Sequence, residues 1–311
     1  MLTPLRLCEG SSVDRSEEAT HFEVIFTACT SMPSEAFEGC VALRSIEAIQ
    51  TGLHMMPRFE GAACAATLTR LCLTDQGLVA IEPLALPNLR ELLLHRNKIT
   101  RIENLEGCPQ LERLWLSDNR IEAIENLHCV GNLKELWLQR NRITRISGLG
   151  YLPSLASLGL SGNPIADFRD LRRLAALPLL SELRLSEPTF GACPIARAEG
   201  YRNFVLCQLR QVRVLDGINI DPDARRGAEA LALQLATDFH ERMQSVEREN
   251  AERMQTLDAR WAGSESRAQE LRKDLVKQLN RLERVVVDGR ATIESEINRQ
   301  VSFIYLFHYI I

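Results

Sequence analysis

The chain has 311 residues, of which 45% are hydrophobic and 25% are charged, and its formal net charge is −4. This length predicts about two domains, and the apolar content is enough for a sizeable core. The slightly negative charge argues against a nucleic-acid partner, because proteins that bind phosphate backbones usually carry a basic surface.

The chain carries no motif of a known catalytic or metal site. Nine cysteines occur without any C-x-x-C pair, so they predict neither a zinc site nor a thioredoxin-type site. We expect small buried side chains and free thiols in a reducing compartment. The six histidines are scattered, and no H-E-x-x-H, G-x-S-x-G, Walker or G-x-G-x-x-G motif occurs. The sequence therefore predicts no enzyme, with no catalytic residue, no metal and no cofactor.

The first predicted element is a capping region over residues 1–36. Its opening segment, MLTPLRLCEGSSVDR, lacks the apolar stretch of a secretory signal. Within it, HFEVIF at 21–26 is either a strand that pairs with the next element or a short helix, and both remain open. The one dense apolar run, 301–311, is too short for a bilayer, which needs about 20 residues. We therefore expect a cytoplasmic protein without a membrane partner.

Residues 37–217 contain a repeat. The frame L-x-x-L-x-L-x-x-N-x-I recurs with its asparagine at intervals of 22 residues, at Asn97, Asn119, Asn141 and Asn163. Looser copies place other residues in the asparagine slot, namely Thr51, Gln76 and Pro188. About seven repeats result, and irregular outer copies are typical of the ends of a solenoid.

The spacing within each repeat predicts one short strand and one turn. Leucines two residues apart point to the same side of a strand, and each repeat must stack on its neighbours to bury them. The asparagine amide then bonds backbone groups that the bend leaves unpaired. The fold class is α/β, a horseshoe-shaped solenoid with parallel strands on its concave face and helical turns such as IENLEGCPQL on its convex side.

The end of the array has its own pattern. The segment YRNFVLCQLRQVRVLDG, residues 201–217, predicts a helix and a final strand that together cap the last repeat. With the repeats, this ending resembles the leucine-rich-repeat family typified by a nuclear regulatory subunit of protein phosphatase 1. The matching positions are Tyr201, Arg202, Val205, Leu209, Val212, Leu215 and Asp216. The chain departs at Arg210, where the family prefers proline, which loosens a turn without changing the fold.

A resemblance over roughly residues 6–290 extends to leucine-rich-repeat proteins related to those of cilia and flagella. It rests on LCEGSSVDR, HFEVIF, LRLSEPTFGACPIARAEGY and the charged segment after Gly217. This resemblance implies a place in the cilium or axoneme, with the nucleus as the alternative. The phosphatase resemblance implies an alternative function, a regulatory subunit of a serine/threonine phosphatase. Residues 299–303, RQVSF, also fit a phosphatase-docking pattern of a basic residue followed by V-x-F.

Residues 218–300 predict a long helical arm. Asp221 suits an N-cap and Pro222 the first helical position. Apolar residues then recur at three-four spacing between charged ones, a coiled-coil-like pattern over 224–300. We expect the arm to pair with itself or with a partner helix, and the alternative is a single charged helix. The apolar tail, 301–311, is either functional or an artefactual end.

The middle residue of each L-x-L segment predicts the candidate binding surface, because it points away from the core. This column reads Cys72, Leu93, Trp115, Trp137, Gly159 and Arg184. Its two tryptophans occupy adjacent strands about 4.8 Å apart. They are either anchors for a partner protein or a stacked pair that stabilises the sheet. Polar residues border the column, namely His95, Arg96, Ser117, Asp118, Gln139 and Arg140 on one flank and Glu91, Arg113 and Glu135 on the other.

The mixed-charge rim around an apolar centre is typical of protein interfaces. The sequence thus predicts a non-catalytic scaffold that binds proteins on its concave face. The predicted contact residues are Leu93, His95, Arg96, Arg113, Trp115, Asp118, Glu135, Trp137, Arg140 and Arg184.

Overall fold

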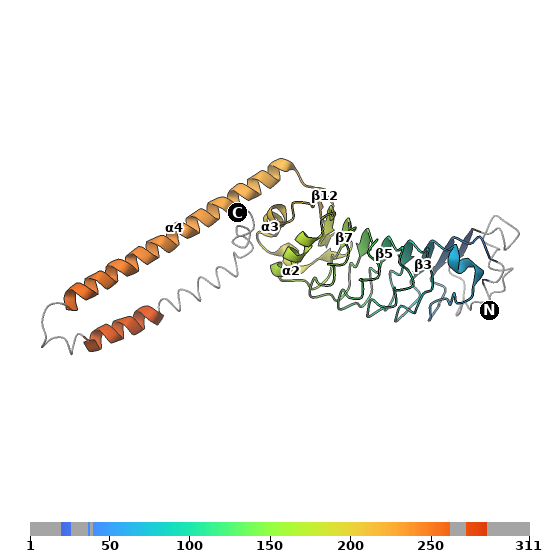
Figure 1. The fold of residues 1–311 in the computed structure, drawn as a ribbon, viewed down its shortest axis with the longest axis horizontal. Coiled ribbons are helices and arrows are strands. Elements are labelled where there is room, and N and C mark those ends of the chain that lie inside the picture. The colour runs from blue at the N-terminus through green and yellow to red at the C-terminus, as the bar shows by residue number, and fades with distance from the viewer. Residues whose placement is uncertain (1–19, 26–36, 38–39, 262–271, 285–311) are drawn as a thin grey trace. The chain divides into compact units, whose positions relative to one another are not determined.

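A computed structural model describes residues 20–25, 37, 40–261 and 272–284 (Figure 1). The chain divides into two compact units. The first unit comprises Met1–Glu199 with Gln208–Ile220, and the second comprises Gly200–Cys207 with Asp221–Ile311. The apolar tail at 301–311 and the V-x-F segment at 299–303 lie outside the described residues.

The first unit is a solenoid built on one ten-stranded sheet. Its strands lie side by side in chain order, and all pairs are parallel except the last (Figure 1). The strands are β1 (His21–Ile25), β2 (Ser45–Ile49), β3 (Arg70–Thr74), β4 (Glu91–Leu93), β5 (Arg113–Trp115), β6 (Glu135–Trp137), β7 (Ser157–Gly159), β8 (Glu182–Arg184), β11 (Val214–Leu215) and β12 (Ile218–Asn219). The open alternative at 21–26 is thereby decided, because β1 is a strand paired with β2.

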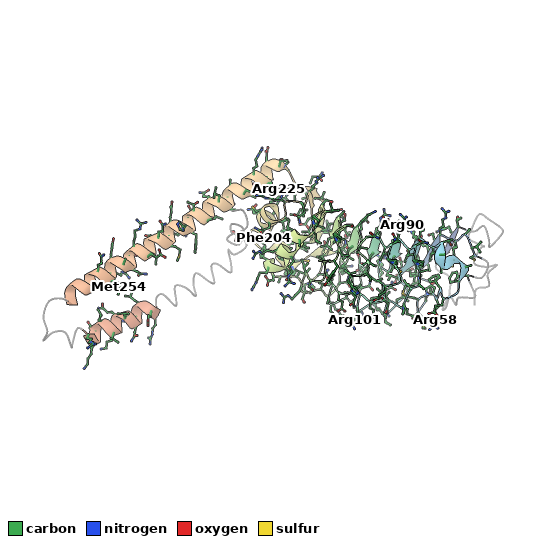
Figure 2. The ribbon with its side chains drawn as sticks, in the orientation of Figure 1. Arg58, Arg90, Arg101, Phe204, Arg225 and Met254 are labelled. Atoms are coloured by element: carbon green, nitrogen blue, oxygen red, sulfur yellow. The ribbon has the colours of Figure 1, made fainter. Side chains whose placement is uncertain are left out.

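A ladder of leucines forms the core of this unit. Leu92, Leu114 and Leu136 are in register on neighbouring strands, and each is fully buried. Complete burial of one leucine contributes about 1.5–3 kcal/mol, so the stacked repeats stabilise one another. The turns that leave the strands run along the other side of the solenoid, and Arg90 and Arg101 accordingly emerge on opposite sides (Figure 2). The predicted parallel-strand solenoid is thus confirmed.

The asparagine slots join each turn to the next. The Asn119 amide donates hydrogen bonds to the backbone oxygens of Leu94 (2.9 Å) and Leu116 (3.0 Å). Its oxygen accepts from the backbone N–H of Ile99 at 3.0 Å. The same pattern recurs at Asn97, Asn141 and Asn163. These bonds satisfy backbone groups that the solenoid bend leaves unpaired in a buried place, as the sequence predicts.

The three looser slots, Thr51, Gln76 and Pro188, differ in how well their side chains pair with these buried backbone groups. Gln76 performs the same task, because its oxygen accepts from the N–H of Leu53 at 3.2 Å and its nitrogen donates to Ala48 O at 2.8 Å. Thr51 is buried in its slot and donates its hydroxyl to Gln76 Oε1 at 2.8 Å. The expectation for Pro188 is wrong, since Pro188 is exposed. A proline has no side-chain donor for a buried slot, and here it lies between two strands of a hairpin.

That hairpin lies in the chain between β8 and β11, which are neighbours in the sheet. It consists of β9 (Ser186–Glu187) and β10 (Gly191–Ala192), paired antiparallel. After it, Asp216 takes over the role of the slot, because its carboxylate accepts from the backbone N–H groups of Leu185 (2.7 Å) and Ser186 (2.9 Å). Asp216 and Gly217 both have positive φ, 53° and 77°, so the chain turns sharply after β11. The strand predicted before Asp216-Gly217 is present as β11, and a short antiparallel strand that was not predicted, β12, follows the turn.

The convex side holds a second ladder that the sequence interpretation missed. Asn104 and Asn126, at φ 61° and 58°, donate their amides to Ile81 O (2.7 Å) and Ile102 O (2.8 Å). Two repeats further on, buried Asp170 accepts from the N–H of Ile146 at 3.3 Å. Short helices complete this unit, namely η2 (Ala63–Ala66), α2 (Phe168–Arg172), η3 (Arg173–Ala176) and η4 (Pro194–Arg197).

The second unit is helical in its described residues. It holds most of α3 (Tyr201–Gln208), the long helix α4 (Pro222–Trp261) and a further helix over 272–284. The Asp221 carboxylate accepts from the Asp223 N–H at 2.9 Å, so the predicted N-cap is confirmed. Most described side chains of α4 are exposed, among them Leu231, Val246 and Met254.

Candidate functional site

The outward side chains of β3 to β8 form the candidate site, which we call the concave face. Leu93, Trp115, Trp137 and Gly159 are in register on consecutive strands, and Arg184 follows on β8. Leu93 is only 6% exposed, whereas both tryptophans are half-buried. The predicted adjacency of the two indoles is thus observed, and part of each ring is open to a partner.

The Trp137 indole contacts two charged side chains. The Arg184 guanidinium lies 5.0 Å from the centre of the indole ring, a distance at which a cation is attracted to an aromatic face. Arg184 is itself fixed by Glu182 and Glu187, each at 2.6 Å. The Trp137 Nε1 also lies 3.5 Å from a Glu135 carboxylate oxygen. The indole is therefore prearranged before any partner arrives.

Trp115 lies beside His95, with ring centres 6.3 Å apart. The His95 Nε2 lies 3.2 Å from the Thr74 hydroxyl, which in turn lies 3.3 Å from the Cys72 sulfur. Burial, and then the neighbouring Arg96 charge, lowers the pKa of His95, so the imidazole is neutral near pH 7. Two buried nitrogens, Trp115 Nε1 and His95 Nδ1, have no hydrogen-bond partner among the described residues.

A row of charged residues borders the column on the side of the polar slots. Arg96, Asp118 and Arg140 each precede a slot residue and have positive φ, 59°, 55° and 52°. A bulky residue in this conformation is uncommon and costs about 1–2 kcal/mol. Two exposed arginines thus adopt a backbone conformation that glycine adopts more easily. Gly162, which precedes the Asn163 slot, has this conformation at the equivalent position of the next repeat. Arg140 pairs with Asp118 at 3.3 Å.

The opposite border is a ladder of alternating charges. Arg70 lies between Glu47 (3.7 Å) and Glu91 (3.5 Å). Arg113 lies between Glu91 and Glu135, the latter at 3.2 Å. The Glu91 charge, with Glu135, raises the pKa of Arg113. These pairs are partly exposed to solvent, and each contributes little to stability on its own, about 0–1 kcal/mol.

The column, the slot-side border and the β9–β10 hairpin enclose an open hollow of about 630 Å³. Its lining is His95, Arg96, Trp115, Ser117, Asp118, Glu135, Trp137, Gln139, Arg140, Arg184, Glu187, Thr189 and Phe190. Of the predicted contact residues, Leu93 and Arg113 do not line it. Leu93 lies beneath the surface, and Arg113 belongs to the charge ladder.

Three lining residues were missed, namely Glu187, Thr189 and Phe190. They come from the β9–β10 hairpin, which the repeat frame at Pro188 concealed. The carbonyl oxygen of Phe190 would lie 2.4 Å from a Cβ on Gly162, so this glycine admits the hairpin close to the sheet. The only sequence signal was the pair Pro188 and Gly191, which are turn-forming residues in an otherwise strand-like segment.

The described residues contain no group of three or more histidines, cysteines, aspartates and glutamates that could hold a metal ion. Burial raises the pKa of Cys64, Cys108 and Cys193 to about 11 each, which keeps these thiols protonated. In the described part of the chain, no helix has the length and apolar character needed to cross a membrane.

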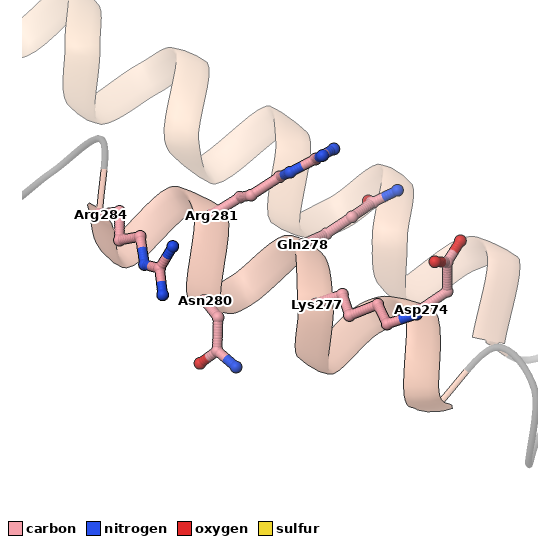
Figure 3. A pocket seen from close by; sticks show the side chains of 6 residues that line it. All are labelled: Asp274, Lys277, Gln278, Asn280, Arg281 and Arg284. Atoms are coloured by element: carbon pink, nitrogen blue, oxygen red, sulfur yellow. The ribbon is translucent and has the colours of Figure 1, made fainter.

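A second hollow lies along the helix at 272–284. Its lining side chains all come from this one helix and are exposed, namely Asp274, Lys277, Gln278, Asn280, Arg281 and Arg284. They point in different directions rather than toward one centre (Figure 3). No buried polar group lies among them, so this surface has the character of a solvated helix face.

Comparison with known proteins supports the repeat architecture. A family model described as "Leucine-rich repeat" matches residues 66–238, more than half of the chain. A search of curated proteins gave no significant match.

Many solved structures resemble the chain. An internalin (inlF) from Listeria monocytogenes has 22% sequence identity and a TM-score of 0.48, covering 64% of this chain and 54% of its own. The Drosophila melanogaster SNF/U2A' complex has 32% identity and a TM-score of 0.38, covering 43% and 75%. An internalin C2 from Listeria monocytogenes has 21% identity and a TM-score of 0.43, covering 54% and 71%. The chain thus spans about half the length of the first of these relatives.

Proposed function

The chain belongs to the leucine-rich-repeat family, and we propose on this premise that it is a non-catalytic scaffold that binds another protein on its concave face. The observation that carries the proposal is the hollow around Trp115 and Trp137. Half-buried tryptophans at the centre of a polar rim are preferred anchors of protein interfaces. Because Trp137 is already held by Arg184, binding costs little side-chain ordering.

The proposal is tested by capture of a partner from cell extract with the whole chain as bait. The variant is Trp115→Ala with Trp137→Ala, and we expect it to lose the captured partner while its far-ultraviolet circular dichroism is unchanged. The matched control is Tyr151→Ala, since Tyr151 is an aromatic side chain that is 66% exposed and lies away from the hollow. Equal capture by the folded double variant and the control contradicts the proposal.

The setting that we propose for this scaffold is the cilium or flagellum. Its support is the resemblance of the chain, over roughly residues 6–290, to the amino-terminal part of leucine-rich repeat-containing protein 9. Proximity labelling in ciliated cells tests this, with the double tryptophan variant as the control for concave-face contacts. Enrichment of ciliary proteins that is lost in the variant supports the setting. Labelling of a nuclear phosphatase without ciliary proteins argues for the alternative.

That alternative is a regulatory subunit of a serine/threonine phosphatase, in the cytoplasm or the nucleus. The resemblance of residues 201–217 to the cap of the phosphatase-regulator group supports it. It requires that phosphatase activity co-purify with the chain and that the concave-face variant lose it. Co-purification that instead depends on Val301 and Phe303 would assign the contact to the V-x-F motif.

We further propose that the arm over 224–300 pairs with a second copy or with a partner helix. Exposed apolar side chains on α4 support this, because a helix that leaves Leu231, Val246 and Met254 in water gains by covering them. Light scattering coupled to size exclusion measures the mass of the whole chain. We expect a dimer that becomes a monomer in Val246→Glu with Met254→Glu, and a monomeric wild-type chain leaves only a partner helix.

A further inference from the structure

Two side chains that line the hollow, Trp115 and His95, carry buried ring nitrogens, Nε1 and Nδ1, that have no partner among the described residues. The indole nitrogen is a donor only, so it needs an acceptor. A buried donor left unpaired costs about 1–3 kcal/mol, and native proteins rarely leave one so. The described residues supply no acceptor, and both atoms are covered in the free chain, so a group from outside can pair with them only when the two rings turn.

The contacts of His95 Nε2 with Thr74, and of Thr74 with Cys72, admit either donor, so the position of the imidazole hydrogen is assigned from acceptor strength. We assign the Thr74 hydroxyl as the donor to His95 Nε2, because a ring nitrogen is a stronger acceptor than the Cys72 sulfur. Burial raises the pKa of Cys72, which therefore stays protonated and can donate to the Thr74 oxygen. With Nε2 accepting, the neutral ring carries its hydrogen on Nδ1. Both unpartnered nitrogens are then buried donors on side chains that line one hollow.

The charges around the hollow indicate the kind of acceptor. Its carboxylates already have cationic partners, since Asp118 pairs with Arg140, Glu135 with Arg113, and Glu187 with Arg184. Arg96, by contrast, lines the hollow, is exposed, and has no ion pair among the described residues. A carboxylate can accept from two N–H donors while it faces a guanidinium, and such charge-assisted bonds are stronger than neutral ones.

We infer that this hollow binds an acidic side chain, aspartate or glutamate, of a partner protein, with Trp115 and His95 donating to its carboxylate and Arg96 balancing its charge. The inference rests on the proposed function and adds the chemistry of the partner. A protein segment fits better than a small anion, because the hollow is open along the sheet, whereas small-molecule sites bury most of their ligand. The rings of Trp115, Trp137 and Phe190 offer apolar contact to the residues beside the acid.

The test starts from a phage-displayed library of random 12-residue peptides selected on the whole chain. Enriched peptides are synthesised with their acidic residue and with its amide, Glu→Gln or Asp→Asn, and their affinities are measured by fluorescence anisotropy. We expect each amide swap to weaken binding about tenfold or more, the worth of a charge-assisted bond. A selection that yields only peptides without acidic residues, or amide peptides that bind equally well, overturns the inference.

Variants of the chain separate the indole donor and the Arg96 charge from general packing. Trp115→Phe keeps an aromatic ring but removes the indole N–H, and Arg96→Gln removes the cation. Each should weaken the acidic peptide about tenfold, whereas the amide peptide should be nearly unchanged in Arg96→Gln and less weakened than the acidic one in Trp115→Phe, since its oxygen accepts only a neutral hydrogen bond. Arg120→Gln, an exposed arginine outside the hollow, is the control and should change neither affinity. The Trp115 indole N–H resonance should also shift downfield with the acidic peptide only.

The same experiment distinguishes failure of this inference from failure of the proposed function. One outcome is that peptides bind, that Trp115→Ala with Trp137→Ala weakens them, and that the acid-to-amide change has no effect. In that case the concave face binds protein but does not select an acid. If peptide binding survives that double variant, the contact lies elsewhere and the proposed function itself is wrong.

Discussion

Gly159 lies under the indole of Trp137 on the neighbouring strand. A Cβ on Gly159 would stand 2.3 Å from Trp137 Cε3 and 2.4 Å from Nε2 of Gln139. Real Cβ atoms do not approach other atoms so closely. Trp137 can occupy this place against the neighbouring strand because Gly159 has no side chain.

The first prediction concerns this pair. In Gly159→Ala, the indole and the Gln139 amide must both move, and overpacking of this kind costs about 1–3 kcal/mol. We expect a lower urea midpoint, a changed tryptophan emission spectrum and weaker binding of concave-face peptides. Gly131→Ala is the matched control, because the nearest atom to its new Cβ would be Tyr151 O at an ordinary 3.9 Å. Equal stabilities and spectra for the two variants would show that Trp137 does not depend on Gly159.

The second prediction concerns the asparagine ladder. Asn119→Ala removes one acceptor and one double donor from a buried slot, and leaves the backbone groups of Ile99, Leu94 and Leu116 short of partners. With about 1–3 kcal/mol for each unsatisfied group, we expect a loss of at least about 2 kcal/mol in the free energy of unfolding.

Asn132→Ala is the control for the ladder. Asn132 is exposed and donates one hydrogen bond, to Pro109 O at 3.1 Å. Its removal should cost less than about 1 kcal/mol, since water replaces the partner. Urea unfolding followed by circular dichroism measures both variants. Asn119 would be shown not to join the turns if its variant were as stable as that of Asn132.

The core of the fold follows from the sequence because a repeat multiplies a weak local signal. One L-x-x-L-x-L-x-x-N segment is ambiguous, but its return at Asn97, Asn119, Asn141 and Asn163 specifies both the inward leucines and the slots. The column with Trp115 and Trp137 then follows from strand alternation alone. The repeat alone was therefore enough to predict which side chains face the core, which fill the slots and which point outward.

The hairpin at β9–β10 did not follow, because its position depends on contacts between residues far apart in sequence. Phe190 reaches Gly162, and Glu187 reaches Gln139 at 3.4 Å. No periodicity encodes these contacts, so the frame at Pro188 suggested a further slot instead. The unpaired nitrogens of Trp115 and His95 were equally beyond a pattern, because they depend on which acceptors surround each atom.

The third prediction concerns the buried thiols. Burial raises the pKa of Cys108 to about 11, so at pH 8 the reactive thiolate is scarce in the folded chain. We expect Cys64, Cys108 and Cys193 to be alkylated by iodoacetamide far more slowly than half-buried Cys129, and all four to react alike in urea. Mass spectrometry of tryptic peptides measures each rate. Fast labelling of Cys108 in the folded chain would contradict its burial.

The last prediction concerns His95. Desolvation by burial, and next the Arg96 charge, lower the pKa of this imidazole below the usual 6.5, while Asp118, Glu47 and Asp75 act weakly in the opposite direction. Below pH 6.5 the His95 imidazole therefore binds a proton more readily in the unfolded chain than in the folded chain. Stability contributed by His95 is present above pH 6.5 and is lost as the pH falls from there toward the folded pKa.

Nuclear magnetic resonance titration of the imidazole, assigned with His95→Gln, measures this directly. We expect a pKa below 6.5 in the free chain and a higher one in Arg96→Gln, because that variant removes a nearby positive charge. Arg120→Gln should leave the value unchanged. An acidic peptide bound in the hollow should raise the pKa of His95, since a carboxylate beside the ring favours the imidazolium. A free-chain value at or above 6.5 would mean that burial and the Arg96 charge do not dominate the pKa of His95, and the ring would then not be held neutral near pH 7.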